Sequence, residues 1–290
     1  MSGRERYRRY GREHPRRRGR TLLWLVLILV MAGAVGLALA NNAFNEDDPP
    51  PAAQASTAPV DKLLIREGLR REDVATLLDA QTTISGARYL ALTAPGARGR
   101  ALARTDRPTS LEGFLFPATY EIAAGTTAEG LVDEQVDAYQ ANTAAIDYGY
   151  ARSRNLTRFD VLIIASMVER EVAVARERPI VAGVIYNRLK AGMRLDIDAT
   201  VQYAVGEWKP ELTAPDLATD SPYNTRLHTG LPPGPIASPG ADSIRASARP
   251  VRHTYIYYVA RNDGTGRHYF SSTAQQFEAD VARSRANAAG

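Results

Sequence analysis

The chain has 290 residues, 44% of them hydrophobic, which is enough to build a core in one large domain or two small ones. The formal net charge of +4 is concentrated at the N-terminus: residues 1–20 hold nine arginines and two glutamates, so the rest carries −3. This excludes a nucleic-acid-binding surface spread over the fold. The absence of cysteine excludes disulfide frameworks, thiol nucleophiles and thiolate zinc sites.

Residues 21–40 follow the basic tail of residues 1–20 and are an uncharged run rich in Leu, Val and Ala. Twenty residues of helix cross about 30 Å of hydrocarbon, so we predict a transmembrane helix with the basic tail in the cytoplasm. A cleaved signal peptide is the alternative, because Ala38-Leu39-Ala40 has the form of a cleavage site, but the apolar run is longer than such peptides usually have. Residues 41–59, with three consecutive prolines, predict an extended linker.

Two domains are predicted after the linker. Residues 60–104 are expected to form a small mixed module with a turn at Gly68, a helix over about 70–80 and a second helix through 89–90. The boundary falls in the stretch 95–108, which is rich in Arg, Ala and Gly. Residues 105–286 are expected to form a helix-rich domain.

Several elements are predicted in this second domain. Residues 111–122 read as a strand or extended segment. A long helix is expected to start with Thr126 and Glu129 as its cap and to reach about residue 155. The proline-rich segment 210–250 has little periodicity and predicts a long functional loop.

A hairpin is predicted at the C-terminal end of the second domain. Residues 254–260 and 267–270 flank an Asp263-Gly264 turn. Ser272 with Gln275 is expected to cap a last helix. The predicted fold class of the exported part is therefore α+β: a mixed module, then a helix-rich domain with a β-hairpin.

The helix expected over residues 159–172 is central to the prediction. Thr157 and Asp160 form a capping signal at its start. Apolar residues recur at the three-and-four spacing of a buried helix face; they are Val161, Ile164, Ala165, Val168 and Val172. A second helix is expected over residues 180–190, ending at Gly192.

Glu169 lies at the margin of this apolar face, with few polar neighbours from its own helix. There the ionised form of a carboxyl group is disfavoured, which suits a general acid. Glu171, on the opposite flank, is the rival. The helix alone also allows both to be solvated side chains at a helix edge.

Several kinds of chemistry find no support in the sequence. The four histidines are scattered without zinc-ligand spacing, and there is no glycine-rich phosphate loop and no GxSxG elbow. Carboxylates, amides and aromatics instead gather in the middle of the chain, a mixture that suits a sugar polymer. They are Glu112, Glu169, Asn187, Asp196, Asp198, Gln202, Tyr223 and Asn224.

Six ordered motifs resemble those of the endolytic murein transglycosylases, the YceG-like or MltG family. They are EGFLFPATY (112–120), ASMVERE (165–171), VIYNRL (184–189), MRLDIDATV (193–201), SPYNT (221–225) and GLPPGPI (230–236). The resemblance covers roughly residues 61–285. Ile65-Arg-Glu-Gly68 is similar to the family's Ile-Pro-Glu-Gly, and the preceding LysM-like unit is degenerate here.

The resemblance implies an inner-membrane enzyme that cleaves nascent glycan strands between N-acetylmuramic acid and N-acetylglucosamine and leaves a 1,6-anhydro end. By motif position its catalytic acid/base is Glu169. Asp196 stands where the family commonly has glutamine, and Ser238 where it has asparagine. The residues expected to hold the sugar are Glu112, Asn187, Asp198, Gln202, Tyr223, Asn224 and Thr225. Glu112 could equally be structural, joining the extended segment to a helix.

This reading predicts one glutamate that first donates and then accepts a proton while the sugar's own C6 hydroxyl attacks, with no metal or cofactor. One alternative is a catalytically silent wall-binding or divisome scaffold. Another is a muramidase that uses Asp196 or Asp198 as a second carboxylate. The expected partners are glycan strands, the membrane through residues 21–40 and, by family analogy, a peptidoglycan synthase. The predicted location is the bacterial cell membrane, with the catalytic domain outside.

Overall fold

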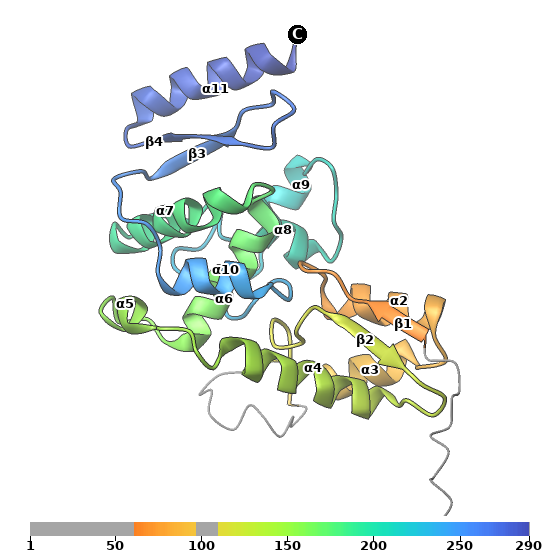
Figure 1. Cartoon of the computed structure of the whole chain (residues 1–290). Coiled ribbons are helices and arrows are strands. Elements are labelled where there is room, and N and C mark those ends of the chain that lie inside the picture. The colour runs from red at the N-terminus through yellow and green to blue at the C-terminus, as the bar shows by residue number, and fades with distance from the viewer. Residues whose placement is uncertain (1–60, 97–109, 290) are drawn as a thin grey trace, which may run out of the picture. The chain divides into compact units, whose positions relative to one another are not determined.

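The structure, a computed structural model, describes residues 61–96 and 110–289 (Figure 1). Within these two ranges no helix is both long and apolar enough to cross a membrane. The predicted basic tail, transmembrane helix and linker lie outside the described residues and stay predictions.

The described residues combine helices with two small sheets, so the α+β class is confirmed in this coarse sense. The elements are, in order, β1 (Asp61–Leu64), α2 (Arg71–Gln81), α3 (Gly86–Thr93), β2 (Thr119–Ile122), α4 (Ala128–Thr143), α5 (Gly149–Arg152), α6 (Arg158–Glu171), η1 (Ala175–Glu177), α7 (Arg178–Lys190), α8 (Asp198–Val205), α9 (Ala214–Leu217), α10 (Ala241–Ala248), β3 (Tyr257–Ala260), β4 (His268–Ser271) and α11 (Ala274–Ala288).

The first sheet joins two distant segments of the chain. Strand β1 pairs antiparallel with β2, with Leu63 opposite Tyr120, and helices α2, α3 and α4 pack around the same core. In that core the hydroxyl of Tyr89 donates a hydrogen bond of 3.0 Å to Oε1 of Gln135. One core is thus shared by residues on both sides of the predicted boundary at 104, and the division into two domains stays a prediction.

Helix α6 lies at the centre of the second core. Its predicted cap is confirmed: the Thr157 side chain accepts from the backbone N–H of Asp160, and the Asp160 carboxylate accepts from the backbone N–H of Thr157. From residue 159 to residue 168 every side chain except Asp160 is buried, so the helix is enclosed on all sides and not on one face alone. Helices α7, α8 and α10 pack against it.

Three expectations about elements were wrong or only partly confirmed. The long helix predicted to reach residue 155 ends at Thr143, because the chain turns there and the Asp147 carboxylate accepts from the N–H of Gly149 to start α5. In the segment 111–122 only Thr119–Ile122 is a strand. The predicted loop 210–250 contains α9 and α10.

The helix caps also differ from the prediction in detail. Thr127, not Thr126, caps α4, and Thr273, not Ser272, caps α11. In each case the cap lies one residue beyond the predicted one.

The predicted C-terminal hairpin is confirmed. Strands β3 and β4 pair antiparallel, α11 covers one face of the hairpin and α7 contacts β3 (Figure 1). Buried His268 holds the hairpin to η1, because its Nδ1 lies 2.8 Å from Oε2 of Glu177.

Gly113 connects two of the sequence motifs. Its φ angle is +82°, and a Cβ atom placed there would lie 2.6 Å from Cβ of Pro235. Glycine is therefore required twice, for the backbone conformation and for the close contact.

We predict that Gly113→Ala destabilises the protein more than Gly125→Ala does. Gly125 has a φ of +90° and open space around it, so alanine there should cost only the left-handed conformation, about 1 kcal/mol. At Gly113 the contact with Pro235 should add about 1–3 kcal/mol. Urea unfolding measures the free energy of unfolding of the two variants. Equal losses of this free energy would contradict the role assigned to the contact between Gly113 and Pro235.

Candidate active site

Glu169 lies in the last turn of α6, where the helix leaves the core. Its side chain is only 7% exposed, and its Oε2 accepts a hydrogen bond of 3.0 Å from the backbone N–H of Gly240. Oε1 lies 3.6 Å from Nη2 of Arg178, accepts no hydrogen bond from any described residue and is not fully buried. One carboxylate oxygen is therefore fixed and the other reaches solvent.

Two loops meet over this end of α6. The N–H of Gly68 donates to the carbonyl of Ser238, and the N–H of Ser238 donates to the carbonyl of Leu69, both at 2.9 Å. Gly68 has a φ of +80°, and its Cβ position lies 3.7 Å from Cγ of Glu169. The paired loops thus place Gly240, the N-cap of α10, beside the carboxylate.

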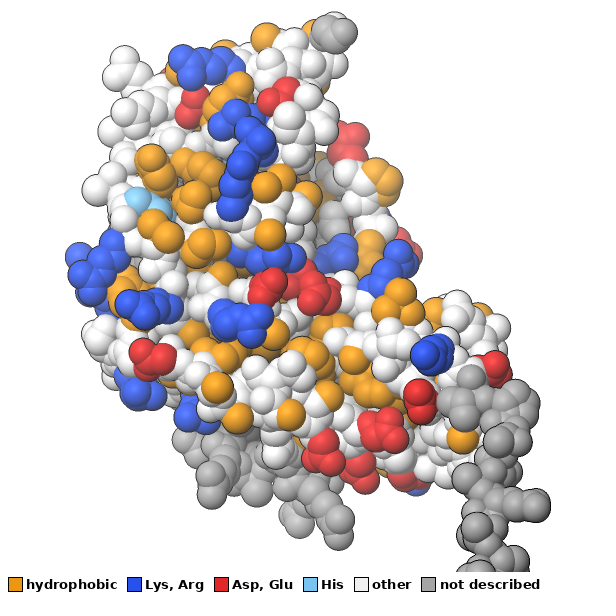
Figure 2. All heavy atoms as spheres, viewed as in Figure 1, with side chains coloured by type: hydrophobic (Ala, Val, Ile, Leu, Met, Phe, Trp, Pro, Cys, Tyr) orange, Lys and Arg blue, Asp and Glu red, His pale blue; other side chains and the backbone are white. Residues whose placement is uncertain are grey.

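Arg178, the first residue of α7, connects two carboxylates. Its Nη2 lies 3.6 Å from Oε1 of Glu169 and 3.9 Å from Oε2 of Glu67. The Glu67 side chain is 49% exposed, so this second carboxylate faces solvent. Figure 2 shows acidic side chains beside Lys and Arg side chains in the middle of the visible face, over α10 and the loop before it.

These contacts show that Glu169 has polar neighbours from elements other than its own helix. The helical wheel represents only α6, whereas the polar neighbours come from the loop before α2, from the start of α7 and from the N-cap of α10. A cation and an N–H donor both favour the ionised carboxylate. The site therefore stabilises the anion that remains after a proton has been donated.

Glu171 is held in a different environment. Its Oε2 accepts a hydrogen bond of 3.0 Å from the hydroxyl of Tyr258 in the hairpin. Burial raises the pKa of Glu171, and the Tyr258 hydrogen bond opposes this effect. The side chain thus ties α6 to the hairpin and does not point to the Glu169 cluster.

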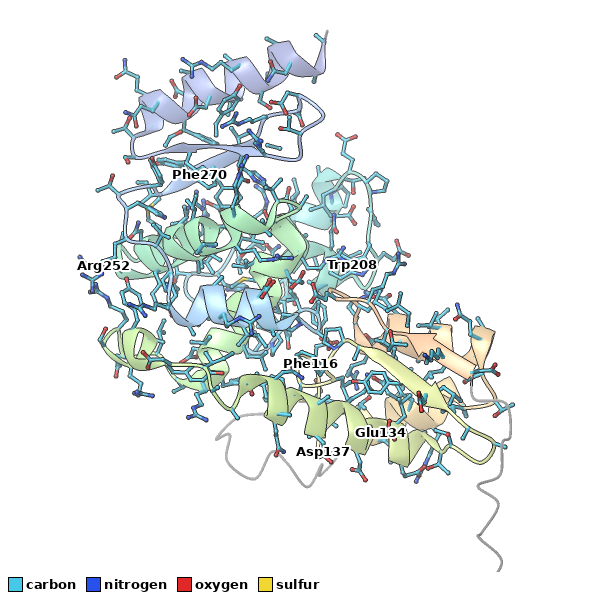
Figure 3. All side chains as sticks on the ribbon, viewed as in Figure 1. Phe116, Glu134, Asp137, Trp208, Arg252 and Phe270 are labelled. Carbon is cyan, nitrogen blue, oxygen red and sulfur yellow. The ribbon has the colours of Figure 1, made fainter. Side chains whose placement is uncertain are left out.

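Trp208 lies between the α8–α9 region and α2 (Figure 3). The guanidinium of Arg170 lies 3.8 Å from its ring centroid and that of Arg70 lies 4.9 Å away. The indole Nε1 donates a hydrogen bond of 3.0 Å to Asp73 in α2. Arg170 also donates to the carbonyl of Gly68, and its charge interacts with that of Glu169.

Asn224 and Thr225, two predicted sugar ligands, are buried in the structure. Asn224 is 0% exposed; its Nδ2 donates to the carbonyls of Leu217 and Thr219, and its Oδ1 accepts from the N–H of Arg226. The hydroxyl of Thr225 lies 2.8 Å from that of Thr200. Their polar atoms therefore hold the 217–226 segment, and their contact with sugar stays a prediction.

Asn187 lies away from the Glu169 cluster. Its Nδ2 donates to the carbonyls of His253 and Tyr255, at 3.0 and 2.9 Å. Nine helical residues, about 14 Å, separate it from Arg178. Its observed role is to hold the chain that leads into β3.

The other predicted sugar ligands remain partly accessible. Asp198 is paired with Arg226, at 2.6 Å between Oδ1 and Nε, and Nε2 of Gln202 donates to the carbonyl of Lys209. Tyr223 packs against Tyr203, with ring centroids 4.7 Å apart. These three residues stay predicted ligands.

Glu112 has the structural role that the sequence left open. It is 1% exposed, and its Oε2 accepts a hydrogen bond of 3.3 Å from the N–H of Arg71, the first residue of α2. It joins the segment before β2 to one of the unpaired N–H groups at a helix start. Burial raises its pKa to about 8, with the Arg71 hydrogen bond opposing the shift.

Asp196 is paired with two arginines. Its carboxylate lies 3.2 Å from Nη1 of Arg188 and 3.7 Å from Nε of Arg194. Within residues 61–96 and 110–289, no three His, Asp or Glu side chains come together in a way that could hold a metal ion.

The sequence and the fold both match known proteins. Residues 46–283 match the model of the YceG-like family, which is most of the chain. The chain belongs to this family. A crystal structure of a YceG-like protein from Listeria monocytogenes superposes with a TM-score of 0.64 at 33% identity and covers 75% of each chain.

Two curated relatives of this YceG-like protein are named endolytic murein transglycosylase. The one from Streptococcus pneumoniae R6 is 39% identical over 178 residues, 59% of this chain and 32% of the relative. The one from Bacillus subtilis 168 is 39% identical over 156 residues, 53% of this chain and 43% of the relative. The chain thus spans less than half the length of either relative.

Glu67, Arg178 and Gly240 are the site residues of this YceG-like chain that sequence reasoning missed. Glu67 lies within the segment compared with the family's Ile-Pro-Glu-Gly, and Gly240 lies two residues after Ser238, but nothing in the sequence brings them together. Arg178 carries no signal beyond its position at a helix start. Only the tertiary pairing of the two loops assembles the three residues.

We predict that Glu112→Gln removes a pH dependence of stability. Below the ordinary pKa of 4.5 the Glu112 carboxyl is protonated in both the folded and the unfolded chain. As the pH rises towards about 8, the unfolded chain loses this proton while the folded chain keeps it. The parent should therefore lose stability across this window relative to the variant, by about 1.4 kcal/mol for each pKa unit.

Chemical unfolding at pH 4, 6 and 8 measures this. Glu121→Gln, which removes an exposed carboxylate from β2, is the control and should follow the parent. If the free energies of unfolding of the parent and Glu112→Gln differ by the same amount at pH 4, 6 and 8, the prediction is contradicted.

Proposed function

We propose that this chain is an endolytic lytic transglycosylase of peptidoglycan. It cleaves the bond between N-acetylmuramic acid and N-acetylglucosamine, and Glu169 is its acid/base. The observation that carries the proposal is the Glu169 carboxylate, fixed through one oxygen by Gly240 and accessible through the other beside Arg178. The names of the relatives give the substrate class, which the geometry alone does not.

The reaction needs one carboxyl group that works twice. Protonated Glu169 donates to the glycosidic oxygen as the bond from C1 of the muramic acid breaks and an oxocarbenium-like state forms. The Glu169 carboxylate then takes the proton of the C6 hydroxyl while O6 bonds to C1. No water is consumed, and the cut strand ends in a 1,6-anhydro sugar.

The fixed groups around Glu169 suit the middle of this cycle. The Gly240 N–H and the Arg178 guanidinium stabilise the carboxylate during the interval between donating and accepting the proton. Because they are held by α10 and α7, they need no rearrangement when the charge appears. Asp198, Gln202 and Tyr223 are our proposed sugar contacts.

The sequence supports a location for this activity. We infer that residues 21–40 anchor the chain in the bacterial cell membrane with the catalytic domain outside, and that residues 41–59 tether it. Such an enzyme would act on newly made glycan strands close to the membrane, where a peptidoglycan synthase is a plausible partner by family analogy.

A muramidase is the second candidate, because Glu67 supplies an exposed carboxylate on the same arginine as Glu169. A hydrolase needs such a second group to act as nucleophile or to activate water. Asp196 and Asp198, the carboxylates expected from the sequence, are instead paired with arginines. The two reactions differ in their products, since hydrolysis leaves reducing ends that are heavier by one water.

We predict that Glu169→Gln lowers the rate of glycan cleavage by about two to four orders of magnitude, because the amide can neither donate nor accept the proton. The rate is measured with the full chain on purified peptidoglycan, with mass spectrometry of the soluble products. The parent should release anhydro ends.

Glu171→Gln is the matched control: it makes the same change two residues away and should keep most of the activity. Cleavage that survives in Glu169→Gln would contradict the assignment. Reducing ends would favour the muramidase, and no products from the parent would favour a non-catalytic scaffold.

A further inference from the structure

We infer that Glu67 is a positioning residue that shares the charge of Arg178 and thereby helps Glu169 to act as the proton donor. This inference rests on the proposed function and deepens it. It assigns a role to an exposed carboxylate that the reaction itself does not require.

The geometry joins three groups from three elements. Nη2 of Arg178 lies 3.6 Å from Glu169 and 3.9 Å from Glu67, and these are the only carboxylates within 4 Å of Arg178 among the described residues. The guanidinium is largely buried, and its Nε has no hydrogen-bond partner within residues 61–96 and 110–289. Its charge is therefore balanced by these two glutamates.

Sharing the Arg178 charge with Glu67 changes the balance between the protonated and the ionised form of Glu169. With Glu67 ionised, two negative charges face one positive charge, and a proton on Glu169 leaves a neutral cluster. Without Glu67, ionised Glu169 and Arg178 form a balanced pair, which resists protonation. Loss of Glu67 should therefore make Glu169 a poorer general acid as pH rises.

Other charged groups near the cluster act less directly. Arg170, next in α6, is directed towards Trp208 and the carbonyl of Gly68. Asp242 of α10 is paired with Arg245, although its charge also contributes to raising the pKa of Glu67, and Glu171 is bound to Tyr258. The pKa of Glu67 is raised by burial first and then by the charge of Glu169, which agrees with coupling between the two carboxylates.

Gly240 makes the arrangement possible. A Cβ atom at this position would lie 1.8 Å from Oε1 of Glu67, whereas its φ of −71° is open to any residue. Gly240→Ala would therefore push the Glu67 carboxylate aside while keeping the N–H that binds Glu169. This provides a second way to disturb Glu67 without removing its charge.

The test is the pH dependence of glycan cleavage by the full chain on purified peptidoglycan. In Glu67→Gln the alkaline limb of the profile should move to lower pH by about one unit, a tenfold loss at alkaline pH with little loss at acidic pH. Arg178→Gln should move this limb to higher pH. Glu121→Gln, an exposed glutamate in β2 with the same charge change, should leave the profile in place.

Gly240→Ala should shift the limb in the same direction as Glu67→Gln. In a Glu67→Ala background, Gly240→Ala should shift the limb little further, because the clash between the new Cβ atom and the Glu67 carboxylate is then absent. Glu67→Asp should restore much of the parental profile.

Each outcome has one reading. A uniform loss at every pH in Glu67→Gln, or an unshifted profile, would overturn the inference while leaving the proposed function intact, provided that the parent still releases anhydro ends. Loss of all turnover in Glu67→Gln together with reducing ends from the parent would make Glu67 the second carboxylate of a hydrolase. Absence of any cleavage by the parent would instead defeat the proposed function.

Discussion

The site depends on backbone pairing between two loops that are about 170 residues apart in the sequence. Gly68 and Leu69 exchange hydrogen bonds with Ser238, and this pairing lies over the last turn of α6. Helix α6 is enclosed by its neighbours up to residue 168, so its end is a fixed point. A side chain that leaves a rigid helix beneath two paired loops has little freedom, which is what a group that must donate and then accept one proton requires.

Local signals predicted the parts of the fold that local forces determine. The capping box at Thr157 and Asp160 and the hairpin around Asp263-Gly264 were correct, because each is decided by neighbours in sequence. The helix predicted to reach residue 155 failed because a side chain at Asp147 competes for the backbone at the break. The helix α10 was missed because it is only eight residues long and lies within a proline-rich segment.

The candidate site was only half predictable for the same reason. Motif position singled out Glu169, and the sequence left Glu112 open between two roles. The neighbours that determine the chemistry of Glu169 come from residues 67, 178 and 240, and their approach is a tertiary event. A sequence motif does not show whether its amides and hydroxyls bind sugar or backbone. Asn224 was therefore predicted as a sugar ligand from its residue type, although its Nδ2 donates to backbone carbonyls.

A single acid/base faces two opposite demands, since it must hold a proton before the bond breaks and hold a charge afterwards. A glutamate paired with an arginine alone meets only the second demand, whereas a glutamate in an apolar pocket meets only the first. A second carboxylate beside the same guanidinium gives Glu169 an environment between these limits, because the arginine can stabilise whichever glutamate is ionised. The Glu67 side chain is 49% exposed and that of Glu169 only 7%, so Glu67 is the more solvated of the two carboxylates that share Arg178.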